Sequence, residues 1–115
     1  MHAFELTDLL AEPSQTDTRY SEFLRVPDLS AGVYVLPAGG TDPQQPHTED
    51  EVYYVVRGRG SITVERESRP VQAGSVVYVP ARIEHRFHTI EEELVILVFF
   101  APAEYAHGAA GEAVG

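Results

Sequence analysis

The run VYYVV at residues 52–56 is the strongest strand signal in the chain, because β-branched and aromatic side chains follow one another there without a break. Such side chains are enriched in strands, where they pack well on a pleated surface. The residues GRG at 58–60 predict a hairpin turn, and SITVE at 61–65 alternates apolar and polar side chains as a half-buried strand does. This stretch therefore predicts two strands joined by a hairpin turn.

Short apolar runs bounded by turn residues continue on both sides of this hairpin. We expect further strands at residues 23–26, 29–35, 75–79, 86–89 and 94–100, and a short one beginning at Val71. Charged turns are expected at residues 66–69 and 91–93. About eight short strands with turn signals every 8–12 residues are typical of an all-β sandwich or barrel.

The first residues of the chain predict one short helix and no targeting signal. Thr7 is a suitable cap for a helix at residues 8–11, which Pro13 would end. The segment lacks the positive charges that precede the apolar core of a signal peptide. No run in the chain approaches the ~20 apolar residues of a membrane-spanning helix. We therefore expect a cytoplasmic protein.

Composition limits the function further. The chain has 115 residues, enough for one domain, and 43% of them are hydrophobic, enough for a core. Asp and Glu number 18 against 8 Lys and Arg, which gives a net charge of −10. Such a charge argues against binding nucleic acid or an anionic membrane and favours cationic partners, including metal ions. The absence of cysteine excludes disulfide scaffolds, zinc ribbons, iron–sulfur clusters and thiol catalysis.

Three residues are well suited to metal chemistry. His47 and Glu51 are four residues apart at the entry to the VYYVV strand, and His85 follows the strand expected at 75–79. Two His with one carboxylate form a ligand set that suits Fe(II), and also Mn, Co, Ni or Zn. The spacing alone leaves a second interpretation open, in which the His residues lie on solvated loops and Glu51 is a surface charge.

The sequence around the first two of these residues resembles the first motif of the cupin superfamily, G-x5-H-x-H-x3-E-x6-G. Gly39, His47, Glu51 and Gly58 match its spacing, and Gln45 stands at the position of its first His.

The sequence around His85 resembles the second cupin motif, G-x5-P-x-G-x2-H-x3-N. Gly74, Pro80 and His85 match its spacing, while Arg82 replaces the second Gly and Thr89 replaces the Asn. The chain is therefore identified as similar to small single-domain bacterial cupins over about residues 29–100.

The resemblance implies an all-β fold, a jelly-roll β-barrel of the cupin double-stranded β-helix type. We expect this barrel at residues 21–102, after an N-terminal arm with the short helix at 1–20 and before a flexible tail at 103–115. The apolar run at 94–100 predicts a strand buried on both faces. Cupins often dimerise through their sheets, so a homodimer is expected.

The resemblance also implies one divalent metal ion inside the barrel. His47, Glu51 and His85 match ligand positions, and Gln45 would be a weaker fourth contact because its amide oxygen is neutral. The ion would be Fe, Mn, Ni, Co or Zn.

Strand alternation predicts which side chains surround this ion. Tyr53 shares the face of Glu51, and Phe87 shares the face of His85, so both are expected in a small-molecule pocket. Arg82 either reaches an anionic substrate or is a solvated loop residue. Glu49 is either an alternate ligand or general base, or a solvated charge, and His88 is expected outside the pocket.

Three functions remain open on this basis. The first is a mononuclear metal-dependent enzyme, a dioxygenase-like oxidoreductase or an isomerase, that acts on a small organic molecule. The second is a non-catalytic cupin that binds a small molecule or a metal. The third is a storage or purely structural barrel. The sequence assigns no catalytic residue.

Overall fold

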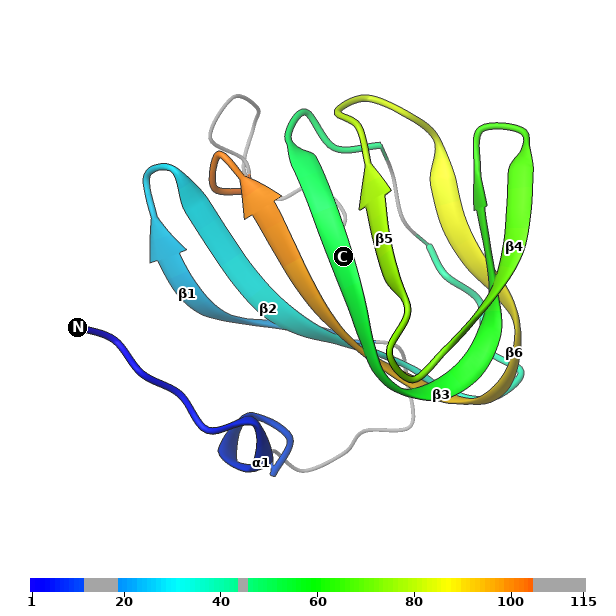
Figure 1. The fold of residues 1–115 in the computed structure, drawn as a ribbon, viewed down its shortest axis with the longest axis horizontal. Coiled ribbons are helices and arrows are strands. Elements are labelled where there is room, and N and C mark those ends of the chain that lie inside the picture. Colours follow the sequence, from blue (N-terminus) through cyan, green and yellow to red (C-terminus); the bar gives the residue numbers. More distant parts are fainter. Residues whose placement is uncertain (12–18, 44–45, 105–115) are drawn as a thin grey trace.

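A computed structural model describes residues 1–11, 19–43 and 46–104. The chain is nearly all β with one short N-terminal helix, as the sequence predicts (Figure 1). The elements in chain order are α1 (Leu6–Leu9), β1 (Arg19–Val26), β2 (Leu29–Leu36), β3 (Asp50–Val64), β4 (Glu67–Gln72), β5 (Val76–Val79) and β6 (His85–Ala101).

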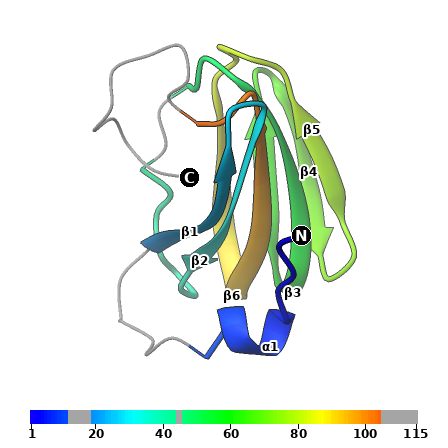
Figure 2. The ribbon, with the colours of Figure 1, turned by 90° about the vertical axis from the view of Figure 1, so that its left-hand side faces the viewer.

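The strands form one antiparallel sheet in the order β1-β2-β6-β3-β4, and β5 pairs with the first part of β3. The two longest strands, β3 and β6, pair along most of their length. Both curve strongly, so that one face of the sheet wraps around an interior (Figures 1 and 2). Curvature of this kind brings residues from opposite ends of one strand to the same place.

The turn predicted at residues 58–60 is wrong, because β3 continues through it. The pairing of β3 with β6 shifts register three times between Val55 and Ser61, which marks bulges that bend the strand. Gly58 has a φ of 101°, and a Cβ atom there would lie 2.1 Å from the carbonyl oxygen of Glu93. Gly58 therefore allows a bend inside a strand, where a turn was expected.

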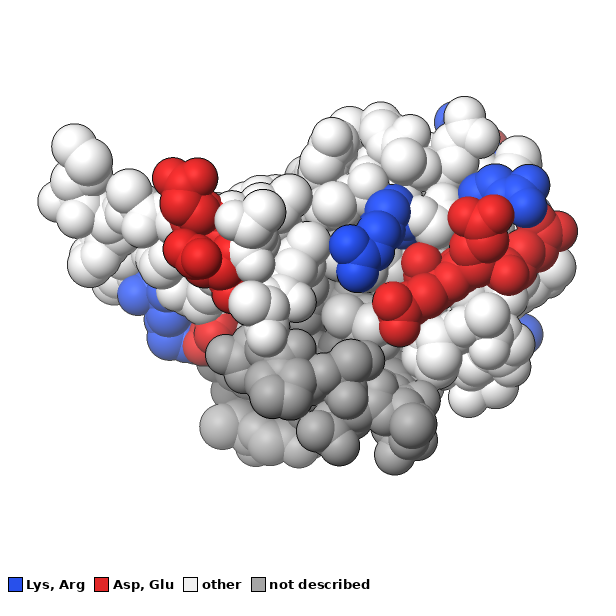
Figure 3. Space-filling view, turned by 90° about the horizontal axis from the view of Figure 1, so that it is seen from below, with Lys and Arg blue, Asp and Glu red and all other residues white. Residues whose placement is uncertain are grey.

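The charged turn predicted at residues 91–93 is also wrong, since β6 runs through it without a break. The acidic side chains lie on the exposed side of the bend, opposite arginines of β3. The side chain of Arg59 lies 3.2 Å from that of Glu92 and 3.6 Å from that of Glu91. Figure 3, which views the molecule from below, shows acidic and arginine side chains beside one another on this face. Cross-strand charge pairs thus allow an acidic triplet to remain in a strand.

Two smaller boundaries also differ from the prediction. The charged turn expected at 66–69 is limited to Glu65 and Arg66, and β4 begins at Glu67. Helix α1 begins at Leu6 with Glu5 at its N-cap position and makes no side-chain capping hydrogen bond. The expected cap, Thr7, lies inside the helix.

The interior is filled by the inward-facing side chains of every strand from β2 to β6. Tyr34, Tyr53, Phe87 and Phe100 are the largest of these, and each is at most 1% exposed. On the outer face Tyr54, Val76 and Tyr78 are exposed. The homodimer stays a prediction.

The chain continues past β6 along the β1–β2 hairpin. Ala103 and Glu104 are buried, and the Ala103 N–H donates to the carbonyl oxygen of Pro27. The rest of the tail expected at 103–115 lies outside the described residues, and the domain boundaries stay predictions. In the described part of the chain, no helix is long and apolar enough to cross a membrane.

Candidate metal centre

The curvature of β6 creates the site. His85 is the first residue of β6 and Phe100 lies near its end, yet both rings lie close to the ring of His47. The ring centroids of His47 and Phe100 are 4.7 Å apart, and those of His47 and His85 are 6.2 Å apart. Glu51, the second residue of β3, faces the same point from the neighbouring strand. Residues far apart in the sequence therefore meet at the start of β3.

His47, Glu51 and His85 form a cluster in which one potential ligand atom of each lies within 4.8 Å of the others. Glu51 Oε1 is 2.9 Å from His85 Nε2 and 3.4 Å from His47 Nδ1. The side chains of these three residues are 1–4% exposed. The sequence thus located three side chains that the fold brings together.

Three polar atoms of the cluster are buried at the site. His47 Nδ1 and both carboxylate oxygens of Glu51 are buried and make no hydrogen bond of good geometry with the described residues. Two imidazoles and one carboxylate are also a ligand set that divalent transition metals prefer. The residues present therefore fit a divalent ion.

Each imidazole is held through the nitrogen that points away from Glu51. The Nδ1–H of His85 donates to the carbonyl oxygen of Ile83 at 2.8 Å, so its Nε2 faces Glu51. The Nε2–H of His47 donates to the carboxylate of Glu104 at 3.0 Å, so its Nδ1 faces Glu51. A hydrogen bond of this kind fixes the tautomer and orientation of a ligating imidazole.

The three groups also shift one another's protonation. Burial opposes ionisation of Glu51, but the adjacent imidazoles of His47 and His85 outweigh it, and the pKa of Glu51 is lowered. Burial likewise disfavours the charged form of His47, but the carboxylates of Glu104 and Glu51 raise its pKa to about 9. The pKa of His85 is raised, since its interaction with Glu51 outweighs burial. The metal-free cluster therefore holds protons that a divalent cation would replace.

A loop at residues 80–84, just before His85, is hydrogen-bonded to the segment that carries His47 and Glu51. The Arg82 N–H donates to the carbonyl oxygen of His47 at 2.6 Å, and the Ala81 N–H donates to Asp50 Oδ1 at 2.8 Å. The side chain of Arg82 is exposed, so its contact here is through the backbone.

The two departures from the second motif have one conformational explanation. Arg82 has a φ of 65° and Thr89 a φ of 51°, both in the left-handed region. Gly enters that region freely, and Asn does so more readily than most residues. The backbone therefore keeps the conformation that Gly and Asn favour, although the side chains differ.

The aromatic residues expected in the pocket lie beside His85. The ring centroid of Tyr53 is 6.0 Å from that of His85 and 4.9 Å from that of Phe87, which it meets edge to face. Both aromatic side chains are buried. Their contact with a substrate, and that of Arg82, stays a prediction.

Other expected site residues have different outcomes. Gln45 lies outside the described residues, so its role as a fourth ligand stays a prediction. Glu49 is 2% exposed and accepts a hydrogen bond from the Thr48 hydroxyl, so its interpretation as a solvated charge is wrong. Glu104, which contacts His47, was missed. No spacing signal marks it, because it lies 57 residues from its partner in a segment expected to be flexible.

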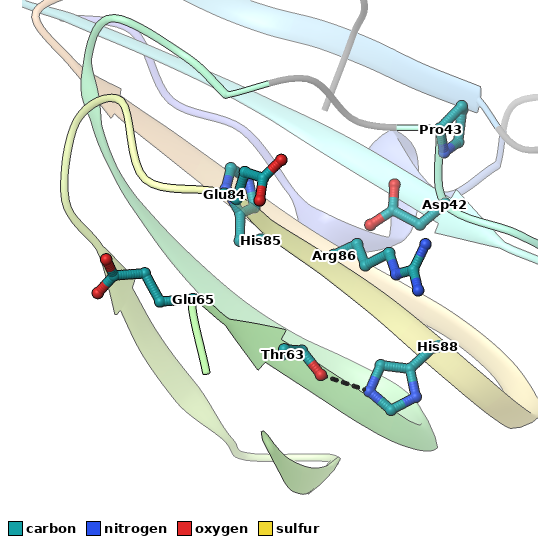
Figure 4. Close-up of a pocket in the computed structure, with 8 residues that line it drawn as sticks. All are labelled: Asp42, Pro43, Thr63, Glu65, Glu84, His85, Arg86 and His88. Atoms are coloured by element: carbon teal, nitrogen blue, oxygen red, sulfur yellow. Dashed lines mark hydrogen bonds between the residues drawn. The ribbon is translucent and has the colours of Figure 1, made fainter. Parts of the chain in front are cut away.

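A cavity of about 820 Å³ borders the start of β6 (Figure 4). Its lining residues come from the loop before β3, the end of β3 and the start of β6, namely Asp42, Pro43, Thr63, Glu65, Glu84, His85, Arg86 and His88. His88, which was expected outside the pocket, lines this cavity and shares a hydrogen bond of 2.8 Å with Thr63, although it lies outside the cluster. His85 is the residue that the cavity and the cluster share, and its side chain is 1% exposed.

Comparisons with known proteins agree with this architecture. The model of the cupin domain family matches residues 32–101. An uncharacterised protein of Streptomyces coelicolor, SCO3923, is 53% identical over 104 residues, which cover 90% of this chain and 99% of that protein.

Two solved structures share the fold at low identity. A cupin of Methanocaldococcus jannaschii, described as RmlC-like with a double-stranded β-helix fold, superposes with a TM-score of 0.69 at 20% identity, covering 79% of this chain and 85% of that one. The protein TT1209 of Thermus thermophilus superposes with a TM-score of 0.74 at 22% identity, covering 90% of this chain and 99% of that one. These likenesses show that the bent sheet is a double-stranded β-helix.

Proposed function

We propose that this chain, which belongs to the cupin domain family, binds one divalent metal ion through His47, Glu51 and His85 and acts with it as a mononuclear enzyme on a small organic molecule. The observation that carries this proposal is the convergence of two buried imidazoles and one buried carboxylate, with one ligand atom of each within 4.8 Å of the others. Two His and one carboxylate form a ligand set that suits a divalent transition metal.

The protein side chains have separate tasks in this proposal. Glu51 supplies the negative charge of the ligand set, and His47 and His85 supply neutral nitrogen donors. Tyr53 and Phe87 keep the surroundings of His85 apolar. A bound ion of the Fe, Mn, Co, Ni or Zn type supplies Lewis acidity toward substrate oxygens, and a redox-active ion also supplies reactivity with O2. Dioxygenase-like chemistry is therefore the reaction class that we propose, with isomerisation as the redox-neutral counterpart.

A non-catalytic metal-binding module is the second candidate. One observation favours it: the ligand side chains are only 1–4% exposed, and among the described residues His85 is the member of the cluster that lines the neighbouring cavity of about 820 Å³. An enzyme needs a route by which substrate reaches the ion, whereas a module that holds a metal does not.

Metal analysis tests the proposal. Tag-free protein purified without a nickel column is reconstituted separately with Fe(II), Mn, Co, Ni and Zn, and its metal content is measured beside that of Glu51→Ala. Glu92→Gln, which alters an exposed carboxylate of β6, is the matched control. We expect near-stoichiometric metal in the wild type and in Glu92→Gln, and loss in Glu51→Ala. Absence of every ion from the wild type would contradict the proposal.

Turnover separates the two candidates. The Fe(II)-loaded protein is tested in an oxygen electrode with a panel of small catechols, 2-oxo acids and 1,3-diketones, whose paired oxygens can chelate a metal, and the products are analysed by mass spectrometry. Substrate-dependent O2 uptake that is lost in Glu51→Ala supports the oxygenase. Isomerised product without O2 uptake supports the redox-neutral enzyme. Bound metal with no conversion of any compound supports the binding module.

A further inference from the structure

Glu104 is a buried carboxylate that neither cupin motif contains. It follows β6 by three residues, and its side chain is 4% exposed. Its Oε2 atom lies 3.0 Å from His47 Nε2, on the side of the imidazole opposite to Glu51. It lies outside the group of ligand atoms that are within 4.8 Å of one another. Glu104 therefore contacts a candidate ligand without being one.

The backbone of Glu104 is fixed by the β1–β2 hairpin. Its N–H donates to the hydroxyl of Ser30 in β2 at 2.8 Å, and its carbonyl oxygen accepts a hydrogen bond from the Arg25 guanidinium in β1. The preceding residue, Ala103, is bonded to the carbonyl of Pro27. These three contacts come from one hairpin. They fix the backbone of Glu104, and thereby the position of its carboxylate beside His47.

We propose that Glu104 is a positioning residue of the metal centre, which selects Nδ1 as the ligating atom of His47. This inference rests on the proposed function. A carboxylate can only accept hydrogen bonds, so the partner nitrogen, Nε2, must carry a proton. In the neutral imidazole that a metal requires, the lone pair is then on Nδ1, the buried atom that faces Glu51.

The two histidines then bind the same ion through different atoms. His85 donates its Nδ1–H to a backbone carbonyl and presents Nε2, whereas His47 donates its Nε2–H to Glu104 and presents Nδ1. The other tautomer of His47 would place a lone pair of Nε2 against the carboxylate and a proton between Nδ1 and Glu51. Glu104 therefore contributes to metal affinity without touching the metal.

Nitrogen NMR of the wild-type protein tests this directly. Zinc is the probe because it is diamagnetic, and long-range proton–nitrogen correlation spectra of ¹⁵N-labelled, zinc-loaded protein identify the protonated and the metal-bound nitrogen of each ring. We expect Nδ1-bound, Nε2-protonated His47 and Nε2-bound, Nδ1-protonated His85. Binding of His47 through Nε2, or no bound zinc, overturns the inference. Absence of all five ions in the metal analysis overturns the proposed function as well.

Two variants measure the size of the effect. Glu104→Leu removes the acceptor, and we expect zinc affinity, measured by competition with a chelating dye, to fall about 10- to 100-fold, as is typical for loss of a partner of a ligating His. Glu104→Gln keeps an acceptor oxygen of the same reach, so it should retain the His47 tautomer and most of the affinity. Glu92→Gln controls for loss of one acidic charge. Wild-type affinity in Glu104→Leu, with its fold verified by circular dichroism, would overturn the inference.

Discussion

His85 and His47 contribute equivalent nitrogen donors to one cluster, but they are oriented by different kinds of partner. His85 is held by the carbonyl of Ile83, two residues before it, whereas His47 is held by the side chain of Glu104, 57 residues after it. The first arrangement follows from the local backbone and tolerates any side chain at the residue that supplies the carbonyl. The second depends on one residue type and on the hairpin that anchors it. Local support is thus robust to substitution, and distant support is vulnerable.

Removing the imidazole of His47 or of His85 should have the largest effect on metal affinity. We expect His47→Ala and His85→Ala each to reduce metal affinity at least about 100-fold, beyond the effect of losing an outer partner, because a direct donor disappears. Metal content after dialysis against a weak chelator measures this loss. Stoichiometric metal in either variant would show that the imidazole is not a ligand.

Substitution of Glu104 should lower metal affinity, whereas substitution of Ile83 should not, because only Glu104 holds its histidine through a side chain. We expect Glu104→Leu to lose affinity, whereas Ile83→Ala should keep wild-type affinity because the carbonyl that holds His85 is retained. Ile83 packs against the core, so its truncation should instead lower the free energy of unfolding by about 1–2 kcal/mol. Urea unfolding and chelator competition on both variants provide the measurements. Equal losses of metal affinity in Glu104→Leu and Ile83→Ala would contradict the view that His85 is held by a backbone carbonyl and His47 by a side chain.

The pH dependence of the metal-free protein should show the charges that surround His47. Glu51 and Glu104 face it as carboxylates and His85 as a second imidazole. Because folding raises the pKa of His47 from 6.5 to about 9, its protonation stabilises the fold fully below pH 6.5, and this contribution is lost as the pH rises through about 9.

The melting temperature of EDTA-treated protein should therefore fall between about pH 6 and about pH 10. The zinc-loaded protein should lack this component, since its ligating nitrogen carries no proton in that range. A metal-free melting temperature that rises over the same interval would contradict the assigned direction.

The smallest expected effect is a change in the free energy of unfolding on substitution of Arg82, in the loop at residues 80–84. Arg82 adopts a φ of 65°, a conformation that costs a residue with a side chain about 1–2 kcal/mol. Arg82→Gly keeps the N–H that donates to His47, so we expect it to raise the free energy of unfolding by about 0.5–1 kcal/mol, after the entropy of a more flexible unfolded chain is subtracted. Arg86→Gly, at an exposed position of β6, is the control and should be destabilising. A lower stability for Arg82→Gly would show that the Arg82 side chain makes a contribution of its own.

The sequence predicted the parts of the molecule that depend on local patterns. Alternating apolar residues indicated the all-β class, and the motif spacing indicated that His47, Glu51 and His85 lie together. The bends were not predicted, because glycine at residue 58 permits a turn and a strand bulge equally well, and the choice depends on the approach of Glu93 from β6. Glu104 could not be predicted either, since its position depends on how the residues after β6 pack against the β1–β2 hairpin.

Anomalous diffraction from crystals of the zinc-loaded protein tests the central claim most directly, because it locates the ion and its ligand atoms together. We predict one peak at the zinc absorption edge, within bonding distance of His47 Nδ1, a carboxylate oxygen of Glu51 and His85 Nε2. A peak elsewhere, or no peak in a protein that keeps this fold, would contradict the account.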